Sequence, residues 1–576
     1  MLNFKIGFPS NYGEASYWHY PKSSPHIPTS DLPMKNIRPT CHENLTQFLL
    51  NTTFHGLKFV GTEFLFLSAF ITAFVIALYF IFDVYNKWDN SPVIVGISPF
   101  AIPIGKMPFP AITICNVNQV LKSKVESLLN NSFKGSLVLE LCNQENDIDA
   151  EKLGNLNFTT SVKDFEDFFV QVSQPCHKLV THCVFGGVKQ NCTEIFQPLI
   201  TDEGLCCTFN KLHTGFFFKK KNFFFFSYRL DNVFAQDGAF PVNWTSSSGY
   251  VGKLPKKYYP RPGVGIGVSN GLSIVLDAEV HEYFCSFTHG AGFKISIHSP
   301  NEIPNAKETG LLIGVGMEAR IRVNVKITEA TNAVRSIQRK YRQCIFEEES
   351  ELLSYAVYSK RNCNMECDAK RLYKKCKCID YYMPHIYSNI TTCGLKDILC
   401  IKNGTNVYLD PNDPVDNEYI KCNAKCLPGC FDYVYKGDMF VSPIISGKFK
   451  LKNKFIEEMD PELVRSSITI LNFFYTENSF HPDSKDQFIG MTEFLSYTGG
   501  LMGLFLGFST ISIIEIIYFC TFRPYCARYR YNKELKSMTR QETEKGMIVN
   551  FNQENVLKFH EQFNAIKPPN KIDYRM

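Results

Sequence analysis

The chain has 576 residues, with 61 Lys and Arg against 56 Asp and Glu, which leaves a net charge of +5. It has no basic run with interleaved aromatic residues, which argues against a nucleic-acid partner. We expect no removable signal peptide, because the N-terminus lacks a short apolar core followed by a small-residue cleavage site. We find no signature of an enzyme, a cofactor or a metal site, and predict none of the three.

An uncharged run, Phe64 to Phe82, predicts a first membrane span. At about 1.5 Å per residue the run is about 28 Å long, close to the roughly 30 Å of a bilayer core. A buried core helix is the alternative, which the absence of charge over this length disfavours. We place the span at residues 63–83, after an N-terminal segment of residues 1–62.

A second run, Leu495 to Phe522, is long enough to cross a membrane but contains residues that a plain anchor would avoid. Its first half carries Gly499, Gly500, Gly503 and Gly507, and its second half carries Glu515. Glycine weakens a helix, and an ionisable group in hydrocarbon costs several kcal/mol. Because such residues usually face a protein interior or a water-filled path, residues 495–522 predict part of a pore.

Two spans place both termini on one side of the membrane, and basic residues indicate which side. The terminal sides of the two spans carry Lys35, Arg38, Lys58, Arg523, Arg528, Arg530, Lys533 and Lys536. By the positive-inside rule both termini are cytoplasmic, residues 523–576 form a cytoplasmic tail, and the region between the spans is extracellular. The sequence therefore predicts a two-span protein of the plasma membrane.

The cysteines are distributed as this topology requires. Of 21 cysteines, those from Cys115 to Cys430 are even in number, as complete pairing outside the cell demands. The others, Cys41, Cys520 and Cys526, lie at or beyond the cytoplasmic ends. Candidate glycosylation sites in the outer region are Asn130, Asn157, Asn191, Asn243, Asn389 and Asn403.

The outer region divides by its sequence pattern. Residues 84–342 form a predicted β-rich body, in which Pro92 to about Thr328 is rich in Val, Ile, Phe and turn residues and alternating runs such as 272–277 and 293–298 predict strands. Residues 343–432 are dense in cysteine and helical in pattern from Glu347, and residues 433–494 return to the membrane. We expect an α+β membrane protein, in which two transmembrane helices flank a large, β-rich, disulfide-rich extracellular domain.

Cysteine spacing predicts a disulfide ladder in the helical part. Cys363 and Cys367 share one helix face, and Cys422 and Cys426 have the same spacing. Two antiparallel helices would pair Cys363 with Cys426 and Cys367 with Cys422, because the residue numbers of the two pairs have equal sums. Further nested pairs would be Cys344–Cys430, Cys376–Cys400 and Cys378–Cys393. A zinc cluster is the alternative, which the outside location and the lack of a CxxC pair disfavour.

Four motifs together resemble the degenerin/epithelial sodium channel superfamily. They are His55-Gly56, YNKWDNSPVIV from Tyr85, FPAITICN from Phe109, and Gly507-Phe508-Ser509. The strings TDEGLCCTFN, YPRPG, GLSIVLDAE and NCNMEC are similar to its insect pickpocket branch. The resemblance covers Cys41 to about Pro524 and rests on the order and spacing of the motifs, since each alone is weak.

The resemblance implies a homo- or heterotrimer of related subunits in membrane lipid. Three second spans would form a narrow pore, selective for Na⁺ and blocked by amiloride. An extracellular ligand or other stimulus, which the sequence does not identify, would open it. Residues 84–342 would form the palm, finger and knuckle of a clenched hand, and residues 343–432 its thumb. A non-conducting accessory subunit and a two-span scavenger or adhesion receptor are the rival interpretations.

By the same resemblance, Gly507, Phe508 and Ser509 would form the selectivity filter. Glycine lacks a Cβ, so a helix can break there and turn carbonyl groups toward an ion. Gly503 and Gly507 also form a GxxxG pair, which alone would indicate helix packing. Glu515 would be an inner-pore carboxylate that concentrates cations, with an interfacial carboxylate as the alternative.

Gating residues also follow from the resemblance. Ser496, eleven residues before Gly507, matches the degenerin position, where a small side chain lets the gate close. Tyr497 and Gly500 would lie near this gate. His55-Gly56 would be the gating motif before the first span.

The remaining cysteines are only partly assigned. Cys183 and Cys192 would close a short loop, and one of the adjacent Cys206 and Cys207 would bridge to Cys115. The sequence does not decide between Cys206 and Cys207 as the partner of Cys115. We take Cys115–Cys207 as the predicted pair. Cys142, Cys176, Cys206 and Cys285 receive no predicted partner.

Overall fold

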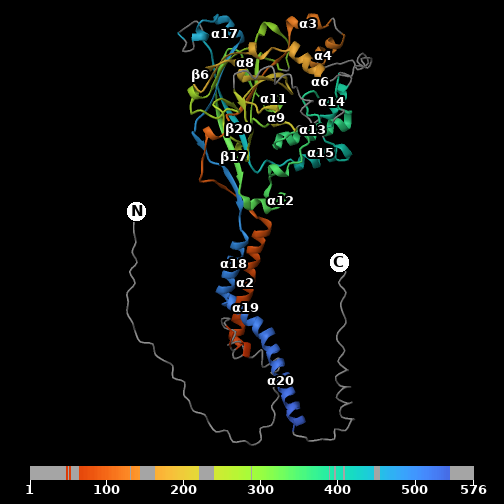
Figure 1. Ribbon diagram of the computed structural model, residues 1–576. Helices are drawn as coiled ribbons and strands as arrows, with labels where there is room; N and C mark the ends of the chain where they lie inside the picture. Colours follow the sequence, from red (N-terminus) through yellow and green to blue (C-terminus); the bar gives the residue numbers. More distant parts are fainter. Residues whose placement is uncertain are drawn as a thin grey trace, which may run out of the picture. The chain divides into compact units, whose positions relative to one another are not determined.

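The computed structural model describes residues 47–49, 51–52, 64–129, 132–142, 162–219, 239–286, 288–387, 390–394, 397–405, 409–445, 450 and 454–544 (Figure 1). The chain divides into two compact units. The membrane unit comprises Met1–Phe82 and Leu495–Met576, and the outer unit comprises Asp83–Phe494.

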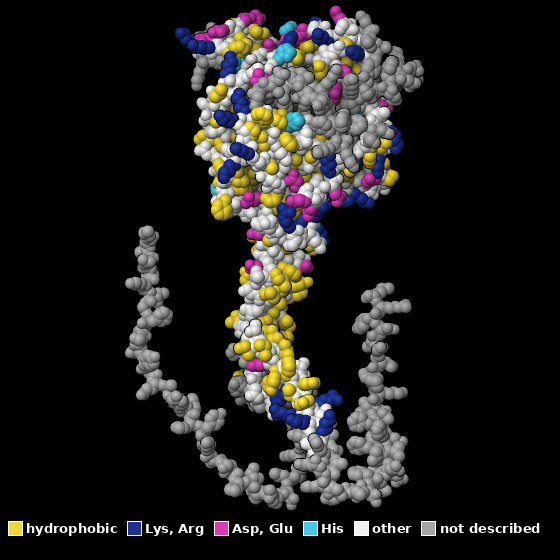
Figure 2. Space-filling model, viewed as in Figure 1, with side chains coloured by type: hydrophobic (Ala, Val, Ile, Leu, Met, Phe, Trp, Pro, Cys, Tyr) yellow, Lys and Arg dark blue, Asp and Glu magenta, His cyan; other side chains and the backbone are white. Residues whose placement is uncertain are grey.

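Long helices form the described part of the membrane unit. α2 (Phe64–Asn90) is apolar enough to span a membrane and continues beyond the predicted end of the first span. The second segment begins with α18 (Met491–Leu506). After a break it continues as one helical stretch through α19 (Thr510–Ile517), a π-helical turn η8 (Tyr518–Phe522) and α20 (Arg523–Glu544). α18 and the stretch that begins at Thr510 form a bent pair. Phe80 of α2 stacks on Phe505 of α18, with ring centroids 6.0 Å apart. Figure 2 shows apolar side chains gathered along the face of these helices that is in view.

A large mixed sheet organises the outer unit. Its strand order is β1-β23-β17-β21-β13-β5-β6, and β20 pairs with β17. The strands are β1 (Val93–Ile97), β23 (Asp483–Gln487), β17 (Met317–Ala330), β21 (Ile468–Tyr475), β13 (Leu272–Asp277), β5 (Val180–Phe185), β6 (Val188–Gln190) and β20 (Asp432–Pro443). β1 follows α2 and β23 precedes α18, and these two strands pair with Val93 opposite Gln487. Neighbouring strands therefore continue into the two membrane segments.

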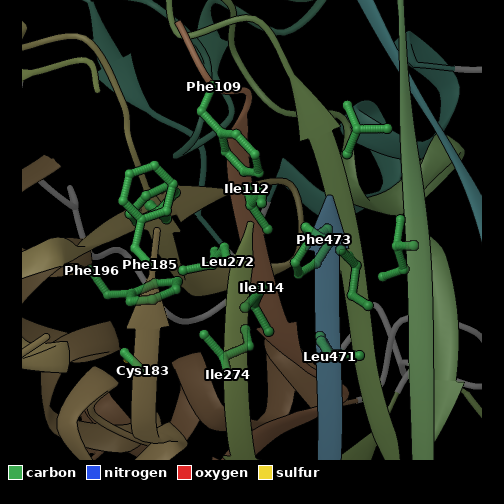
Figure 3. Packing of buried hydrophobic residues seen from close by; sticks show 14 of the residues in the cluster. Phe109, Ile112, Ile114, Cys183, Phe185, Phe196, Leu272, Ile274, Leu471 and Phe473 are labelled. Carbon is green, nitrogen blue, oxygen red and sulfur yellow. The ribbon is translucent and has the colours of Figure 1, made fainter. Parts of the chain in front are cut away.

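A five-stranded sheet shares its core with the large sheet. Its order is β16 (Leu311–Gly314), β15 (Gly292–His298), β3 (Ala111–Asn116), β8 (Gly204–Phe209) and β7 (Phe196–Thr201). Every residue of β3, which lies within the FPAITICN motif, is buried. Its alternation directs Ile112 and Ile114 into the common core, where they lie near Leu272 and Phe473 of the large sheet (Figure 3).

The intervening residues of β3 make polar contacts. The imidazole of His298 lies 2.9 Å from Thr113 Oγ1 through Nε2 and 2.9 Å from the Ser299 carbonyl through Nδ1. Because a carbonyl only accepts, Nδ1 carries the proton and Nε2 accepts from Thr113. Thr113 in turn lies 2.9 Å from the hydroxyl of Thr208. Burial lowers the pKa of His298 to about 4.

Short elements complete the outer unit. The two-stranded pairs are β2 (Ile102–Pro103) with β22 (Ser479–Phe480), β4 (Asn118–Leu121) with β14 (Tyr283–Ser286), β9 (Phe240–Pro241) with β12 (Tyr258–Tyr259), β10 (Trp244–Thr245) with β11 (Gly249–Tyr250), and β18 (Cys378–Ile379) with β19 (Thr391–Thr392). The helices before residue 343 are α3 (Lys122–Leu129), α4 (Ser132–Cys142), α6 (Val162–Val172), α7 (Cys176–Leu179), α8 (Cys192–Ile195), α9 (Thr214–Phe217), α11 (Ala306–Thr309) and α12 (Arg339–Arg342). After residue 453 come α16 (Lys454–Glu457) and α17 (Pro461–Ser467).

The cysteine-rich part contains α13 (Lys360–Cys376), α14 (Ile398–Gly404) and α15 (Pro414–Lys425). The helix begins later than the predicted Glu347, because Glu347–Glu349 form only a 3₁₀ turn and Ser359 caps α13. The ladder is present as Cys344–Cys430, Cys363–Cys426, Cys367–Cys422, Cys376–Cys400 and Cys378–Cys393. Cys363, Cys367 and Cys426, whose sulfur atoms cluster as metal ligands would, are thus all used in bridges.

A buried ion pair also joins α13 to α15. Arg371 Nε lies 2.8 Å from Asp416 Oδ1, and the two side chains are 6% and 3% exposed. Lys375 Nζ lies 2.7 Å from the same oxygen. Burial alone would raise the pKa of Asp416, but the hydrogen bonds from Lys375, the Asp410 N–H and Arg371 lower it to about 2.

The predicted Cys115–Cys207 bridge is wrong. β3 and β8 are antiparallel with Ile114 opposite Cys207, which places Cys115 opposite Cys206. Those two residues form the bridge, with Cα atoms 4.4 Å apart. Successive side chains of a strand point to opposite faces, so Cys207 points away and bonds to Cys176. Cys183–Cys192 is present as predicted, and Cys142 pairs with Cys285.

Candidate ion pathway in the second membrane segment

A face of small residues runs along α18. Ser496, Gly500 and Gly503 follow one another at intervals of four and three residues, so they share one side of the helix, and Gly507 comes directly after its end. Ser496 is exposed, and a Cβ added at Gly500 would meet no other atom within 4 Å. No described part of this chain covers that position. Small residues at such a face allow another backbone or a water-filled path to approach closely.

α18 ends at a glycine cap. Gly507 has φ +64°, in the left-handed region, and its N–H donates to the Gly503 carbonyl at 2.9 Å. This is the arrangement of a helix C-cap, and a side chain with a Cβ would be strained there. The next N–H, of Phe508, donates to the Met502 carbonyl at 3.2 Å. The axis turns by 73° between α18 and the following helix.

α19 begins at a serine cap. Ser509 is extended, and its Oγ accepts the Ser512 N–H at 3.4 Å. The Ser512 Oγ accepts the Ser509 N–H at 3.1 Å, so the two serines cap each other reciprocally. Gly507-Phe508-Ser509 is therefore a helix stop, a link and a helix start. Gly507 and Ser509 are needed for the two caps, whereas neither cap requires a particular side chain at Phe508.

The break determines what this segment can do chemically. A helix that ends leaves the carbonyl groups of its last turn without intrahelical partners. At membrane depth such groups are tolerated only where they face protein or line a water-filled cavity. Backbone carbonyls so placed can replace part of the hydration shell of a cation. The Met502 and Gly503 carbonyls already accept cap N–H groups, so a cation pathway would draw its main-chain ligands from the other carbonyls of the break.

Glu515, on α19, is half-buried and hydrogen-bonded to the N-terminal segment. Thr52 Oγ1 donates to Glu515 Oε2 at 3.2 Å, and the Thr52 side chain is buried. A neutral donor of this kind orients a carboxylate without cancelling its charge. The predicted gating motif, His55-Gly56, lies outside the described residues, three positions beyond Thr52.

The same N-terminal segment contacts the second membrane segment one and two turns further on. Phe48 packs edge-to-face on Phe519, with ring centroids 5.5 Å apart. Arg523 lies over the Phe519 ring at 5.1 Å and donates a hydrogen bond to the Gln47 side chain. Residues 47–49 and 51–52 therefore lie alongside the C-terminal half of the second membrane segment.

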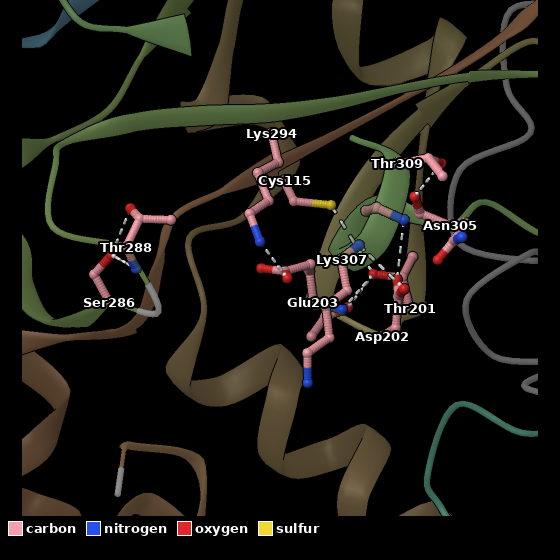
Figure 4. A network of polar contacts seen from close by, with 12 residues as sticks. Cys115, Thr201, Asp202, Glu203, Ser286, Thr288, Lys294, Asn305, Lys307 and Thr309 are labelled. Atoms are coloured by element: carbon pink, nitrogen blue, oxygen red, sulfur yellow. Dashed lines mark hydrogen bonds and ion pairs between the residues drawn. The ribbon is translucent and has the colours of Figure 1, made fainter. Parts of the chain in front are cut away.

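The TDEG turn of the outer unit is a structural cluster (Figure 4). Asp202 accepts the N–H groups of Ala306 and Lys307, at the start of α11, at 3.2 and 3.1 Å. Glu203, 1% exposed, pairs with Lys294 Nζ at 2.6 Å. Burial is the main influence on both carboxyls and raises the pKa of each. These contacts fix the β7–β8 hairpin, which carries Cys206 and Cys207.

The predicted glycosylation sites differ in exposure. Asn191 is exposed and caps α8 by accepting the Thr193 N–H, whereas Asn243 is half-buried. Asn403 lies in α14. Asn130, Asn157 and Asn389 fall outside the described residues.

Comparison with known proteins assigns the chain to a family. The family described as "Amiloride-sensitive sodium channel" matches residues 48–519. The chain belongs to this family. It is 36% identical over 516 residues to Pickpocket protein 28 of Drosophila melanogaster, which covers 87% of this chain and 83% of that protein. It is 23% identical over 511 residues to Acid-sensing ion channel 1C of Danio rerio, which covers 84% of this chain and 84% of that protein.

A further relative is the Bile acid-sensitive ion channel of Rattus norvegicus, 23% identical over 82% of this chain and 86% of that protein. The predicted membership of the superfamily and of its pickpocket branch is confirmed. Members of the family have two spans and a large extracellular domain, as the sequence predicts. Two of these relatives are named as ion channels.

Sequence reasoning missed two features of this pathway. The spacing of Ser509 and Ser512 is a readable cap signal, because a side chain at the cap position reaches the N–H three residues on. The Thr52–Glu515 bond has no such signal, since it joins residues 463 positions apart. Only the packing of the N-terminal segment against the second membrane segment reveals it.

Proposed function

We propose that the chain is a subunit of a trimeric, amiloride-sensitive Na⁺ channel of the plasma membrane, opened by an extracellular ligand or other stimulus. Both termini are cytoplasmic, and the outer unit faces the extracellular space. The observation that carries this proposal is the capped break at Gly507–Ser509 in a membrane segment. The uncovered position at Gly500 supports an assembly, because other subunits would close the pathway that one chain leaves open.

The proposal assigns each part of the segment a role. Ser496, Tyr497 and Gly500 form the gate, and Gly507, Phe508 and Ser509 form the selectivity filter. Glu515 concentrates cations at the inner mouth, oriented by Thr52. His55-Gly56 is the gating motif of the N-terminal segment.

The outer unit supplies the stimulus-sensing part of this proposal. Paired strands β1 and β23 are continuous in sequence with α2 and α18, so movement of the large sheet reaches both membrane segments through the chain itself. The disulfide ladder makes α13 and α15 a stiff element suited to transmitting displacement rather than to chemistry.

Recording from oocytes that express the chain tests the function. We expect an inward current that amiloride blocks and that disappears when a large organic cation replaces Na⁺. Surface protein without current under any stimulus would indicate a non-conducting accessory subunit instead. Surface labelling distinguishes that outcome from failed expression.

Substitution at the proposed gate tests the assignment separately. Ser496→Val and Ser496→Trp should produce a standing current, because bulk at this position holds the gate open. Thr498→Val is the matched control, since Thr498 lies on the opposite side of α18. An unchanged resting conductance in the Ser496 variants, with normal surface expression, would contradict the gate.

A further inference from the structure

The helix after the second membrane segment begins with a cluster of cations. α20 starts at Arg523, directly after Phe522, and Arg528, Arg530 and Lys533 are exposed on it. Figure 2 shows Lys and Arg side chains gathered where the apolar surface of these helices ends. Arg523 is engaged with Phe519 and Gln47. The other three make no ion pair with another side chain that the structure describes.

The distance of these cations from the apolar end is short. At about 1.5 Å per residue, Arg528 and Arg530 begin about 9 and 12 Å beyond Phe522. Helical side chains lean toward the N-terminal end, which here is the membrane end, so their guanidinium groups reach back. A headgroup layer is roughly 5–8 Å thick, and its potential extends a further 8 Å or so at physiological salt. Both groups therefore fall within the field of the lipid surface.

The directions of these side chains indicate the kind of partner. At about 100° per residue, Arg528, Arg530, Lys533 and Lys536 point to several sides of α20 rather than converging. Such a collar is suited to many monovalent charges spread over a plane, not to one polyphosphorylated headgroup. The exposed Tyr525 and Tyr529 add amphipathic rings of the type found at membrane interfaces.

We propose that this collar, Arg528, Arg530, Lys533 and Lys536, binds the anionic lipid surface of the cytoplasmic leaflet. The choice of leaflet rests on the proposed cytoplasmic orientation of the tail. A surface potential of about −30 mV favours each unit charge about threefold, so the two nearest arginines together give a preference of about tenfold. Because α20 continues from the turn in which Phe519 contacts Phe48, the collar also fixes the depth of the Glu515 region.

Lipid selectivity of the reconstituted full-length chain tests the proposal. Spin-labelled phosphatidylserine and phosphatidylcholine at trace levels report which lipid associates with the protein. We expect a several-fold preference for phosphatidylserine at 0.05 M salt, in the range of 3- to 10-fold, that falls toward one at 0.5 M as screening increases. The R528Q/R530Q/K533Q variant should lose the preference.

Two matched variants make the test specific. K253Q/K256Q/K257Q removes the same charge from exposed lysines of the outer unit and should keep the preference. R528K/R530K/K533R keeps the charge and should also keep it. An unchanged preference in R528Q/R530Q/K533Q would overturn the proposal. So would its loss in the charge-conserving variant, or a preference confined to polyphosphoinositides, since either indicates a stereospecific headgroup site.

This measurement is independent of conduction. The labelled lipids occupy both leaflets of the vesicle, so the result does not depend on the orientation of the protein or on an open pore. A negative result would leave the proposed channel function standing. Loss of current in oocytes would likewise leave the lipid preference to be measured.

Discussion

Gly507→Ala should move the second membrane segment from a broken toward a continuous helix. Gly507 has φ +64°, where a Cβ costs about 1–2 kcal/mol, and alanine favours a continuous helix by about 1 kcal/mol over glycine. The combined bias of about 2 kcal/mol shifts the equilibrium in each subunit about 30-fold. In the proposed trimer three copies add to about 6 kcal/mol against the broken conformation.

The consequence is measurable as ion selectivity. If the break supplies carbonyl ligands, its loss returns them to helical hydrogen bonds, and Na⁺ preference or current should fall. Reversal potentials under bi-ionic Na⁺ and K⁺ conditions in oocytes measure the preference, and surface labelling confirms expression. Ser509→Ala removes the opposing cap, worth about 1 kcal/mol, and should have a smaller effect in the same direction. Ser509→Thr, which keeps the cap, should restore it.

Gly503→Ala is the matched control for Gly507→Ala. It adds the same methyl group within helical backbone, where the new Cβ would lie 3.7 Å from the Phe508 carbonyl, an ordinary contact. We expect its selectivity to equal that of the unmodified chain. Wild-type reversal potentials in both variants would refute a filter at the break. Equal losses in both would instead indicate that Gly503 and Gly507 act as a packing pair.

Three further predictions concern single contacts. Thr52→Val should reduce inward Na⁺ conductance by releasing Glu515, and the double variant with Glu515→Gln should conduct no less than Glu515→Gln alone. The pKa of His298 is about 4 in the folded chain, below its ordinary 6.5. The unfolded chain therefore binds a proton first as the pH falls, and the free energy of unfolding drops by about 3 kcal/mol between pH 6.5 and pH 4. His298→Gln should flatten this part of the profile of Tm against pH. Lys294→Met should lower the free energy of unfolding by about 3 kcal/mol, because it leaves the buried Glu203 carboxylate without its partner. Adding Glu203→Gln should recover most of this loss in thermal unfolding. A double variant no more stable than Lys294→Met would contradict the coupling.

The disulfide ladder could be predicted because a helix fixes its own register. Cysteines four apart must share a face, and one antiparallel arrangement then satisfies Cys363, Cys367, Cys422 and Cys426 together. The same reasoning could not predict where α13 begins, because that boundary depends on the cap at Ser359. Periodicity predicts that a helix exists more reliably than where it begins.

The error at Cys115 has a different origin. Adjacent cysteines on a strand point to opposite faces, so choosing between Cys206 and Cys207 requires the register of β8 against β3. That register is set by pairing between segments about ninety residues apart, which no local pattern states. A shift of one residue would exchange the two cysteines, so the sequence left both pairings open.

Within the second membrane segment, the Gly507–Ser509 break could be predicted from local sequence, whereas the role of Glu515 depends on a contact with a distant segment. A C-cap glycine followed by an N-cap serine is local chemistry, readable in three consecutive residues whatever surrounds them. Glu515 alone fits either an inner-pore or an interfacial carboxylate. An interfacial carboxylate facing bulk water needs no protein donor, whereas this one is half-buried and accepts from the buried Thr52 hydroxyl. That contact favours the inner-pore role, because a group held in a fixed direction exerts its charge at one place along the pathway.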